Sequence, residues 1–233
     1  MSNNEKYHSF VPFILIYAAL VICDLIIGSN PRLIEYRYFT KPAILSALII
    51  FFLVRKNKVR SSVFWITTLA LLFSLFGDIL LLFVEKSQVF FIRGLVMFLL
   101  AHLMYILVFL KKQNKQKKGV LFFLLSSLYG GILFGVLYLG LGDMMIPVII
   151  YMIVILIMAN TAYLRDGCVP KISFKLVFIG ALLFMISDSL LAYSLFYSTL
   201  FLENVWIMST YAFAQLLIVL GILKQENQTR IIG

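Results

Sequence analysis

Long apolar segments alternate with short polar connections along the whole chain. Eight such segments run over residues 10–27, 40–54, 62–84, 91–110, 119–139, 144–163, 174–196 and 204–223. Most are close to the ~20 residues that a helix needs to cross the hydrocarbon core of a bilayer. The second has a short apolar core, 42–54, and reaches this length only if its helix begins near Phe39. The pattern predicts a single transmembrane domain, 1–233, with eight spans.

Composition supports a membrane protein over a soluble one. Hydrophobic residues make up 63% of the chain and charged residues 13%, whereas a soluble domain has about 25% charged residues. A helix in lipid can be apolar on every side. The predicted fold class is therefore an all-α integral membrane protein, a bundle of about eight transmembrane helices. We expect the first segment to be a retained helix, because only Lys6 precedes it and no A-x-A cleavage site follows.

The basic residues predict the orientation of the bundle. Fifteen of the 20 Lys and Arg side chains fall in the two termini and alternate connections, and five fall on the opposite side. Because positively charged loops remain in the cytoplasm, both termini are expected there. The membrane itself is expected to be the inner membrane of a bacterium. The net charge of +10 therefore does not indicate nucleic-acid binding. The basic loops suit general attraction to anionic membrane lipids, and a specific anionic lipid or partner is the alternative.

The two cysteines are not expected to form a disulfide. Cys23 lies near the outer end of the first segment and Cys168 lies in a cytoplasmic connection, so the membrane separates them. No spacing of Cys and His resembles a zinc site. The sequence therefore suggests no metal.

Two of the segments resemble each other. The third contains LLFSLFGDILLLF (71–83) and the seventh contains ALLFMISDSLLAY (181–193), which align on Asp78 and Asp188. Both segments run outward in the predicted topology. Two parallel four-helix repeats would explain this, and chance similarity between Leu- and Phe-rich helices is the alternative.

Few ionisable residues lie deep in these segments. A central Asp or Lys costs about 2.5–3.5 kcal/mol on insertion scales, so each needs a partner, water or a function. At about 1.5 Å per residue, Asp78 and Asp188 lie roughly 21–24 Å from the cytoplasmic edge of a ~30 Å core. His102 and Gln215 lie about 16 Å below the outer edge. Asp24 is near enough to the outer surface for hydration to be expected.

These depths predict one polar pocket between the midplane and the outer surface. Helical spacing places Ser74 with Asp78, His102 with Tyr105, and Tyr211 with Gln215 on shared faces. Each also has a structural interpretation: Gln215 as an interhelical hydrogen bonder, the tyrosines as packing residues, and the acids as members of buried ion pairs with Lys41 or His102.

Several stretches together resemble a known family. They are FTKPAIL at 39–45, LLFSLFGDILLL at 71–82, GLVMFLLAHLMYI at 94–106, GALLFMISDSLLA at 180–192 and YAFAQLLI at 211–218. In this order they are similar to the YhhN family of membrane proteins, which includes the animal lysoplasmalogenases. The resemblance implies eight helices and hydrolysis of the vinyl ether of a lysophospholipid, giving a fatty aldehyde and a glycerophospho-alcohol. It does not fix the substrate of this chain.

The implied chemistry requires a proton delivered to carbon and water captured by an oxocarbenium ion. One protonated and one ionised carboxyl group suit these steps, as in glycosidases. Asp78 and Asp188 are assigned this shared catalytic role, with His102 orienting a group or relaying a proton. The substrate-binding candidates are Lys41, which would hold the phosphate at the outer mouth, with Tyr105, Ser74, Tyr211 and Gln215. The reaction needs no metal or organic cofactor.

Two other classes of function use the same residues or fold. Acids and a histidine inside a membrane also suit a proton-coupled transporter or lipid-binding protein. A noncatalytic assembly factor would leave the paired acids unexplained. Which acid donates the proton stays open at this point, because a coupled pair titrates jointly.

Overall fold

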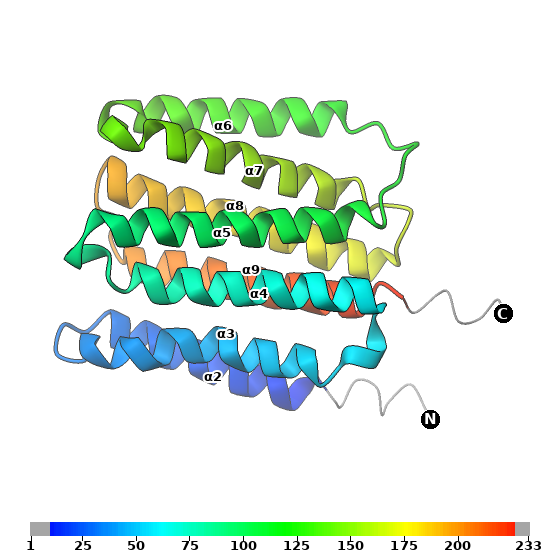
Figure 1. Ribbon diagram of the computed structural model, residues 1–233, viewed down its shortest axis with the longest axis horizontal. Coiled ribbons are helices and arrows are strands. Elements are labelled where there is room, and N and C mark those ends of the chain that lie inside the picture. Colours follow the sequence, from blue (N-terminus) through cyan, green and yellow to red (C-terminus); the bar gives the residue numbers. More distant parts are fainter. Residues whose placement is uncertain (1–9, 227–233) are drawn as a thin grey trace.

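The computed structural model describes residues 10–226, and this part of the chain folds into eight long helices (Figure 1). They are α2 (Val11–Gly28), α3 (Arg37–Leu53), α4 (Ser61–Leu81), α5 (Gln88–Leu110), α6 (Val120–Leu141), α7 (Met145–Tyr163), α8 (Lys171–Phe196) and α9 (Glu203–Leu223). Four 3₁₀ turns lie between them: η1 (Ile34–Tyr36), η2 (Lys56–Lys58), η3 (Val84–Lys86) and η4 (Gly142–Met144). The predicted helical class is confirmed.

The uncertain second segment has a full-length helix. α3 begins at Arg37, two residues before Phe39, and follows directly on η1. Together they give an apolar stretch of 20 residues, Ile34–Leu53. Pro42 lies inside α3, in its second turn, where its missing N–H removes one intrahelical hydrogen bond, the one to the Tyr38 carbonyl.

Seven stretches of the described chain are long and apolar enough to span a membrane. One of them, Val120–Tyr163, has 44 residues and would extend about 66 Å as a straight helix. It instead contains α6 and α7, which reverse at Gly142, where φ is +47°, and lie side by side (Figure 1). The chain is therefore a multi-pass helical membrane protein, and the eight helices correspond to the eight predicted segments.

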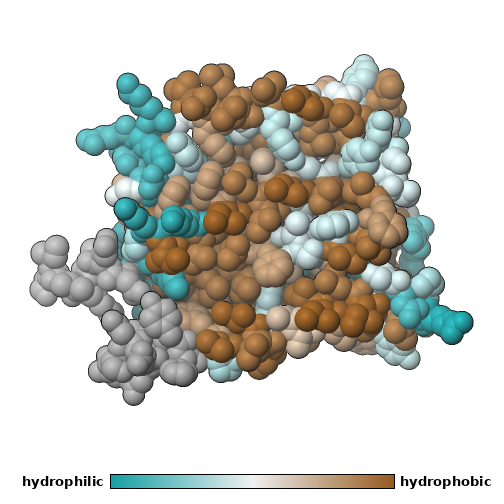
Figure 2. Space-filling model, turned by 180° about the vertical axis from the view of Figure 1, so that it is seen from behind, coloured by the Kyte–Doolittle hydropathy of each residue, from teal (hydrophilic) through white to brown (hydrophobic). Residues whose placement is uncertain are grey.

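The surface follows the membrane prediction. Figure 2 shows an apolar band across the middle of the bundle, with hydrophilic residues at both ends. Large side chains such as Leu139 and Phe213 are exposed within the helices, which lipid tolerates. α2 begins and α9 ends at the same end of the bundle (Figure 1). The assignment of this end to the cytoplasm stays a prediction.

The helices pack in the same order in the two halves of the chain. In α2–α5 and in α6–α9, each helix packs on the next, and the third and fourth have the most extensive contact. Small residues allow this closeness: a Cβ on Gly180 of α8 would lie 2.9 Å from the Ala214 carbonyl oxygen of α9. The two halves meet mainly through α5 with α7 and through α2 with α9. That the two halves are parallel repeats stays a prediction.

Candidate active site

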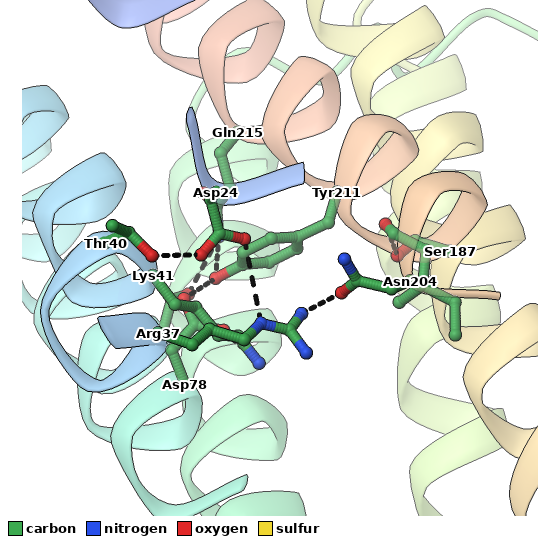
Figure 3. Close-up of polar contacts among 11 residues, drawn as sticks. Asp24, Arg37, Thr40, Lys41, Asp78, Ser187, Asn204, Tyr211 and Gln215 are labelled. Atoms are coloured by element: carbon green, nitrogen blue, oxygen red, sulfur yellow. Dashed lines mark hydrogen bonds and ion pairs between the residues drawn. The ribbon is translucent and has the colours of Figure 1, made fainter. Parts of the chain in front are cut away.

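Asp78 lies on α4, and two other helices supply its partners. Its carboxylate is buried, with Lys41 Nζ of α3 3.6 Å from Oδ1. The Tyr211 hydroxyl of α9 donates a hydrogen bond of 2.9 Å to Oδ2. Figure 3 shows these side chains converging from the three helices. Asp78 is therefore held as one member of a buried, hydrogen-bonded ion pair.

Asp188 of α8 has different neighbours. The Tyr151 hydroxyl of α7 donates a hydrogen bond to Oδ2, and His102 Nε2 of α5 lies 3.9 Å from the same oxygen. No lysine or arginine within the described residues forms an ion pair with Asp188. Its side chain is 15% exposed, compared with 3% for Asp78.

His102 lies behind Asp188, away from open space. It is fully buried, and its ring packs edge-on against Phe184 and Tyr151, with centroid distances of 4.5 and 5.3 Å. Neither ring nitrogen has a hydrogen-bond partner within residues 10–226. The 3.9 Å separation from Asp188 exceeds hydrogen-bonding distance, so in this conformation the imidazole lies beside the acid without bonding to it.

The other predicted polar residues form a buried network that joins Asp78 through Tyr211. The Tyr105 hydroxyl donates to Gln215 Oε1 at 2.6 Å, and Gln215 Nε2 donates to Ser74 Oγ at 3.0 Å. A longer contact of 3.4 Å joins Gln215 Nε2 to the Tyr211 hydroxyl. Ser74, Tyr105 and Gln215 are fully buried. They connect α4, α5 and α9, and Gln215 thus acts as the interhelical hydrogen bonder of its structural interpretation.

One cavity of about 420 Å³ opens beside both acids, within the 300–1,000 Å³ common for small-molecule sites. Asp78, Asp188, Lys41, Tyr151 and Tyr211 line it. The rest of the wall is largely apolar, including Leu81, Phe91, Leu95, Phe98, Val148, Ile207 and Met208. The polar residues predicted to share a depth thus do meet, but Ser74, Tyr105, Gln215 and His102 lie outside the cavity lining, and direct substrate binding by the first three is not what the geometry favours.

The outer end of the cavity differs from the sequence prediction. Lys41 lines the cavity and pairs with Asp78, and Arg37, one helical turn away on α3, lines it as well. Asp24 is fully buried, not hydrated: the Thr40 hydroxyl donates to its Oδ1 at 2.6 Å, and Arg37 Nε lies 3.8 Å from its Oδ2.

Three site residues were missed by sequence reasoning: Arg37, Tyr151 and Asn204. Arg37 had a usable signal, since it precedes Lys41 by four residues and therefore shares its helix face. Tyr151 also had one, since it follows Lys41 by the same 110 positions that separate the two acids. Asn204 had none, because its contact with Arg37 depends on how α9 packs near α3.

The structural interpretation, in which the acids are members of buried ion pairs, holds for one of the two acids. Lys41 pairs with Asp78, as it would in a purely structural ion pair. Such a pair gives no reason for a second acid, or for an adjoining cavity. Among the described residues, no group of three His, Cys, Asp or Glu side chains comes together as a metal site would require, and both cysteines are free.

A sequence profile of the YhhN family matches residues 36–222. The match covers α3 to α9 nearly in full, and thus every residue of the two acid sites. No curated protein and no solved structure matches the chain.

Proposed function

Because this chain belongs to the YhhN family, we propose that it is a membrane-embedded, lysoplasmalogenase-like hydrolase that cleaves the vinyl ether of a lysophospholipid and releases a fatty aldehyde. One observation carries the proposal. Two carboxyl groups from α4 and α8 line the same cavity, each with its own tyrosine hydroxyl bonded to it. Vinyl ether hydrolysis needs such a pair, with one group protonated and the other ionised.

The neighbours of the acids suggest their roles. Lys41 pairs with Asp78 and makes it the carboxylate of the two. Asp188 has no such cation, and it is the more exposed to the cavity. Its Oδ1 has no hydrogen bond within the described residues, so this oxygen can carry the transferable proton. Asp188 is accordingly the general acid and Asp78 the stabilising carboxylate and base.

The reaction then balances with water as the only co-reactant. Asp188 gives its proton to the vinyl carbon distal to the ether oxygen, and an oxocarbenium ion forms at the proximal carbon. Asp78 faces this cation, and takes a proton from the water that attacks it. The hemiacetal hydroxyl returns a proton to Asp188 as the C=O bond forms. The ether C–O bond breaks, and the leaving alkoxide takes the proton held by Asp78.

The cavity wall suits an amphiphile. Its apolar side chains can take the hydrocarbon chain, and the two acids stand where the reactive ether would lie. Tyr151 and Tyr211 fix the carboxyl groups, and His102 packs behind Asp188 as a positioning residue. The proposal invokes no metal or organic cofactor.

The test is aldehyde release by purified protein in detergent from a lysoplasmalogen. The matched 1-O-alkyl lysophospholipid, which has no double bond, should be inert. In D₂O, the proposed step places one deuterium on the carbon next to the aldehyde, and rapid trapping of the product preserves it for mass spectrometry. The control variant Asp143→Asn, which changes an exposed acid of η4 outside the cavity, should retain full rate.

Absence of aldehyde from a monodisperse, stable preparation would count against the enzyme. A proton-coupled transporter built on the same acids would release no aldehyde, and would instead move protons with a solute in sealed vesicles.

A further inference from the structure

The outer end of the cavity holds a polar cluster that the proposed chemistry does not use. It consists of Asp24 on α2, Arg37 and Thr40 on α3, and Asn204 on α9, and is called the Arg37 cluster below (Figure 3). Arg37 and Asn204 line the cavity, whereas Asp24 is fully buried behind them. Burying an acid, a cation and an amide at one point of an otherwise apolar helix bundle costs free energy, and such a cluster therefore indicates a function.

The guanidinium group of Arg37 is held but not saturated. Arginine has five N–H donors, and within the described residues its only hydrogen bond runs from Nη2 to Asn204 Oδ1. Its Nε lies 3.8 Å from Asp24 Oδ2, and both atoms lack a hydrogen-bond partner. Donors remain for a ligand, in the fork geometry that binds the oxygens of a phosphate in pairs.

Charge placement favours Arg37 over Lys41 as an anion ligand. Lys41 lies 3.6 Å from Asp78, so an anion that reached Lys41 would also meet a carboxylate on the cavity wall. The acid that accompanies Arg37, Asp24, lies on the side away from the cavity. Glu35, Glu85 and Glu203 also line the cavity. Glu35 and Glu85 are exposed, where solvent screens their charge, and the half-buried Glu203 accepts a hydrogen bond from the Ser194 hydroxyl.

The distance along α3 fits a lysolipid. Arg37 stands one turn outward of Lys41, about 6 Å along the axis, and Lys41 marks the level of Asp78. The ether oxygen and the phosphate of a lysophospholipid are separated by the three carbons of glycerol, which is a comparable length. A ligand with its ether beside the acids would therefore bring its phosphate to Arg37.

We propose that the Arg37 cluster is the subsite for the phosphate group of the ligand: Arg37 binds the phosphate, and Asp24, Thr40 and Asn204 position the guanidinium. The inference rests on the proposed function for the kind of ligand, an alkyl phosphate ester. It does not require that the ligand be cleaved.

The experiment measures binding rather than turnover, so its failure is distinct from failure of the proposed function. Calorimetry in a phosphate-free detergent uses three probes: a non-cleavable 1-O-alkyl lysophospholipid, the 1-O-alkylglycerol of the same chain length, and inorganic phosphate. Arg37→Gln should lower the affinity for the lysophospholipid about tenfold or more, as expected for loss of a charged hydrogen bond. Its affinity for the alkylglycerol should stay within about twofold of the wild-type value, because this ligand has no charge for the arginine to bind.

Matched variants guard against a folding artefact. Arg32→Gln removes an exposed arginine of the connection between α2 and η1 that does not line the cavity, and this variant should bind both lipids as the wild type does. Arg37→Lys keeps the charge without the fork, and should lie between Arg37→Gln and the wild type. Competition by inorganic phosphate in the wild type, but not in Arg37→Gln, would show that the subsite takes phosphate from either source. Arg37-dependent lipid binding without such competition would assign it to the lipid headgroup.

Two results would overturn the inference. One is an Arg37→Gln protein that binds the lysophospholipid as tightly as the wild type. The other is an Arg37→Gln protein that loses affinity for both lipids equally and melts at a lower temperature, with no rescue by Arg37→Lys. That result would make the cluster a structural support only.

Discussion

Asp78 and Asp188 occupy equivalent places in the two halves of the chain, yet their surroundings differ. Each stands on the third helix of its half, and each accepts a tyrosine hydroxyl. For Asp78 the tyrosine comes from α9 and the nitrogen-bearing side chain, Lys41, comes from α3. For Asp188 the tyrosine comes from α7, the counterpart of α3, and the nitrogen-bearing side chain, His102, comes from α5, the counterpart of α9. The two kinds of partner have exchanged places.

The numbering supports this comparison. Asp78 and Asp188 are 110 positions apart, as are Lys41 and Tyr151. Tyr105 and Gln215 have the same separation and are hydrogen-bonded to each other. Such a contact between residues at matching positions is the one that the predicted repeat would place near its axis. Lys41 beside one acid and Tyr151 beside the other make the surroundings of the two acids chemically different, which an acid and base pair requires.

Asp188→Asn gives the largest expected effect. If Asp188 is the proton donor, its loss should lower kcat for aldehyde release by about 10²–10⁴, the usual contribution of general acid catalysis. Asparagine keeps the size of the side chain and can still accept the Tyr151 hydroxyl, so the melting temperature should change little. Retention of more than about a tenth of the wild-type rate by a well-folded variant would remove Asp188 from the mechanism.

Asp78→Asn should also inactivate, but it should cost stability as well. It leaves the buried ammonium group of Lys41 without its carboxylate, and breaking a buried pair costs about 3–5 kcal/mol. Adding Lys41→Met should restore much of the thermal stability without restoring turnover. Thermal unfolding in detergent and aldehyde release would be measured on the two single variants and the double variant. Equal stability losses in Asp78→Asn and Asp188→Asn would erase the proposed difference between the acids.

Removal of the tyrosine hydroxyls should have the smallest effect. Tyr211→Phe deletes a hydrogen bond to the ionised Asp78, worth about 1.5–3 kcal/mol, and Tyr151→Phe deletes one to the protonated Asp188, worth about 0.5–1.5 kcal/mol. The expected loss of kcat is roughly tenfold or greater for Tyr211→Phe and a few-fold for Tyr151→Phe, with little change in KM, because the hydroxyls position the acids rather than the substrate. A change in KM alone would instead place the hydroxyls in ground-state substrate binding.

The depth of the polar residues was predictable because it depends only on the rise of a helix. Counting residues from the helix ends placed the two acids at one level, and the structure brings them to one cavity. The same count could not tell a cavity-facing residue from one in a network behind it. Ser74 and Gln215 lie within about two helical turns of that level, yet they bond to each other behind the cavity wall. Which side of a helix faces open space depends on its neighbours.

The sequence by itself determined the solvent, the eight apolar segments and the two deep acids, because each depends on local composition and on the fixed length of a helix per residue. Only the tertiary structure decided the partners: Lys41 with Asp78, Tyr151 with Asp188, and Arg37 with Asn204. These contacts join helices far apart in the chain, and helices that are apolar on every side carry no stripe to set their rotation. Close packing at small residues such as Gly180, together with the need of each buried polar group for a partner, sets that rotation instead.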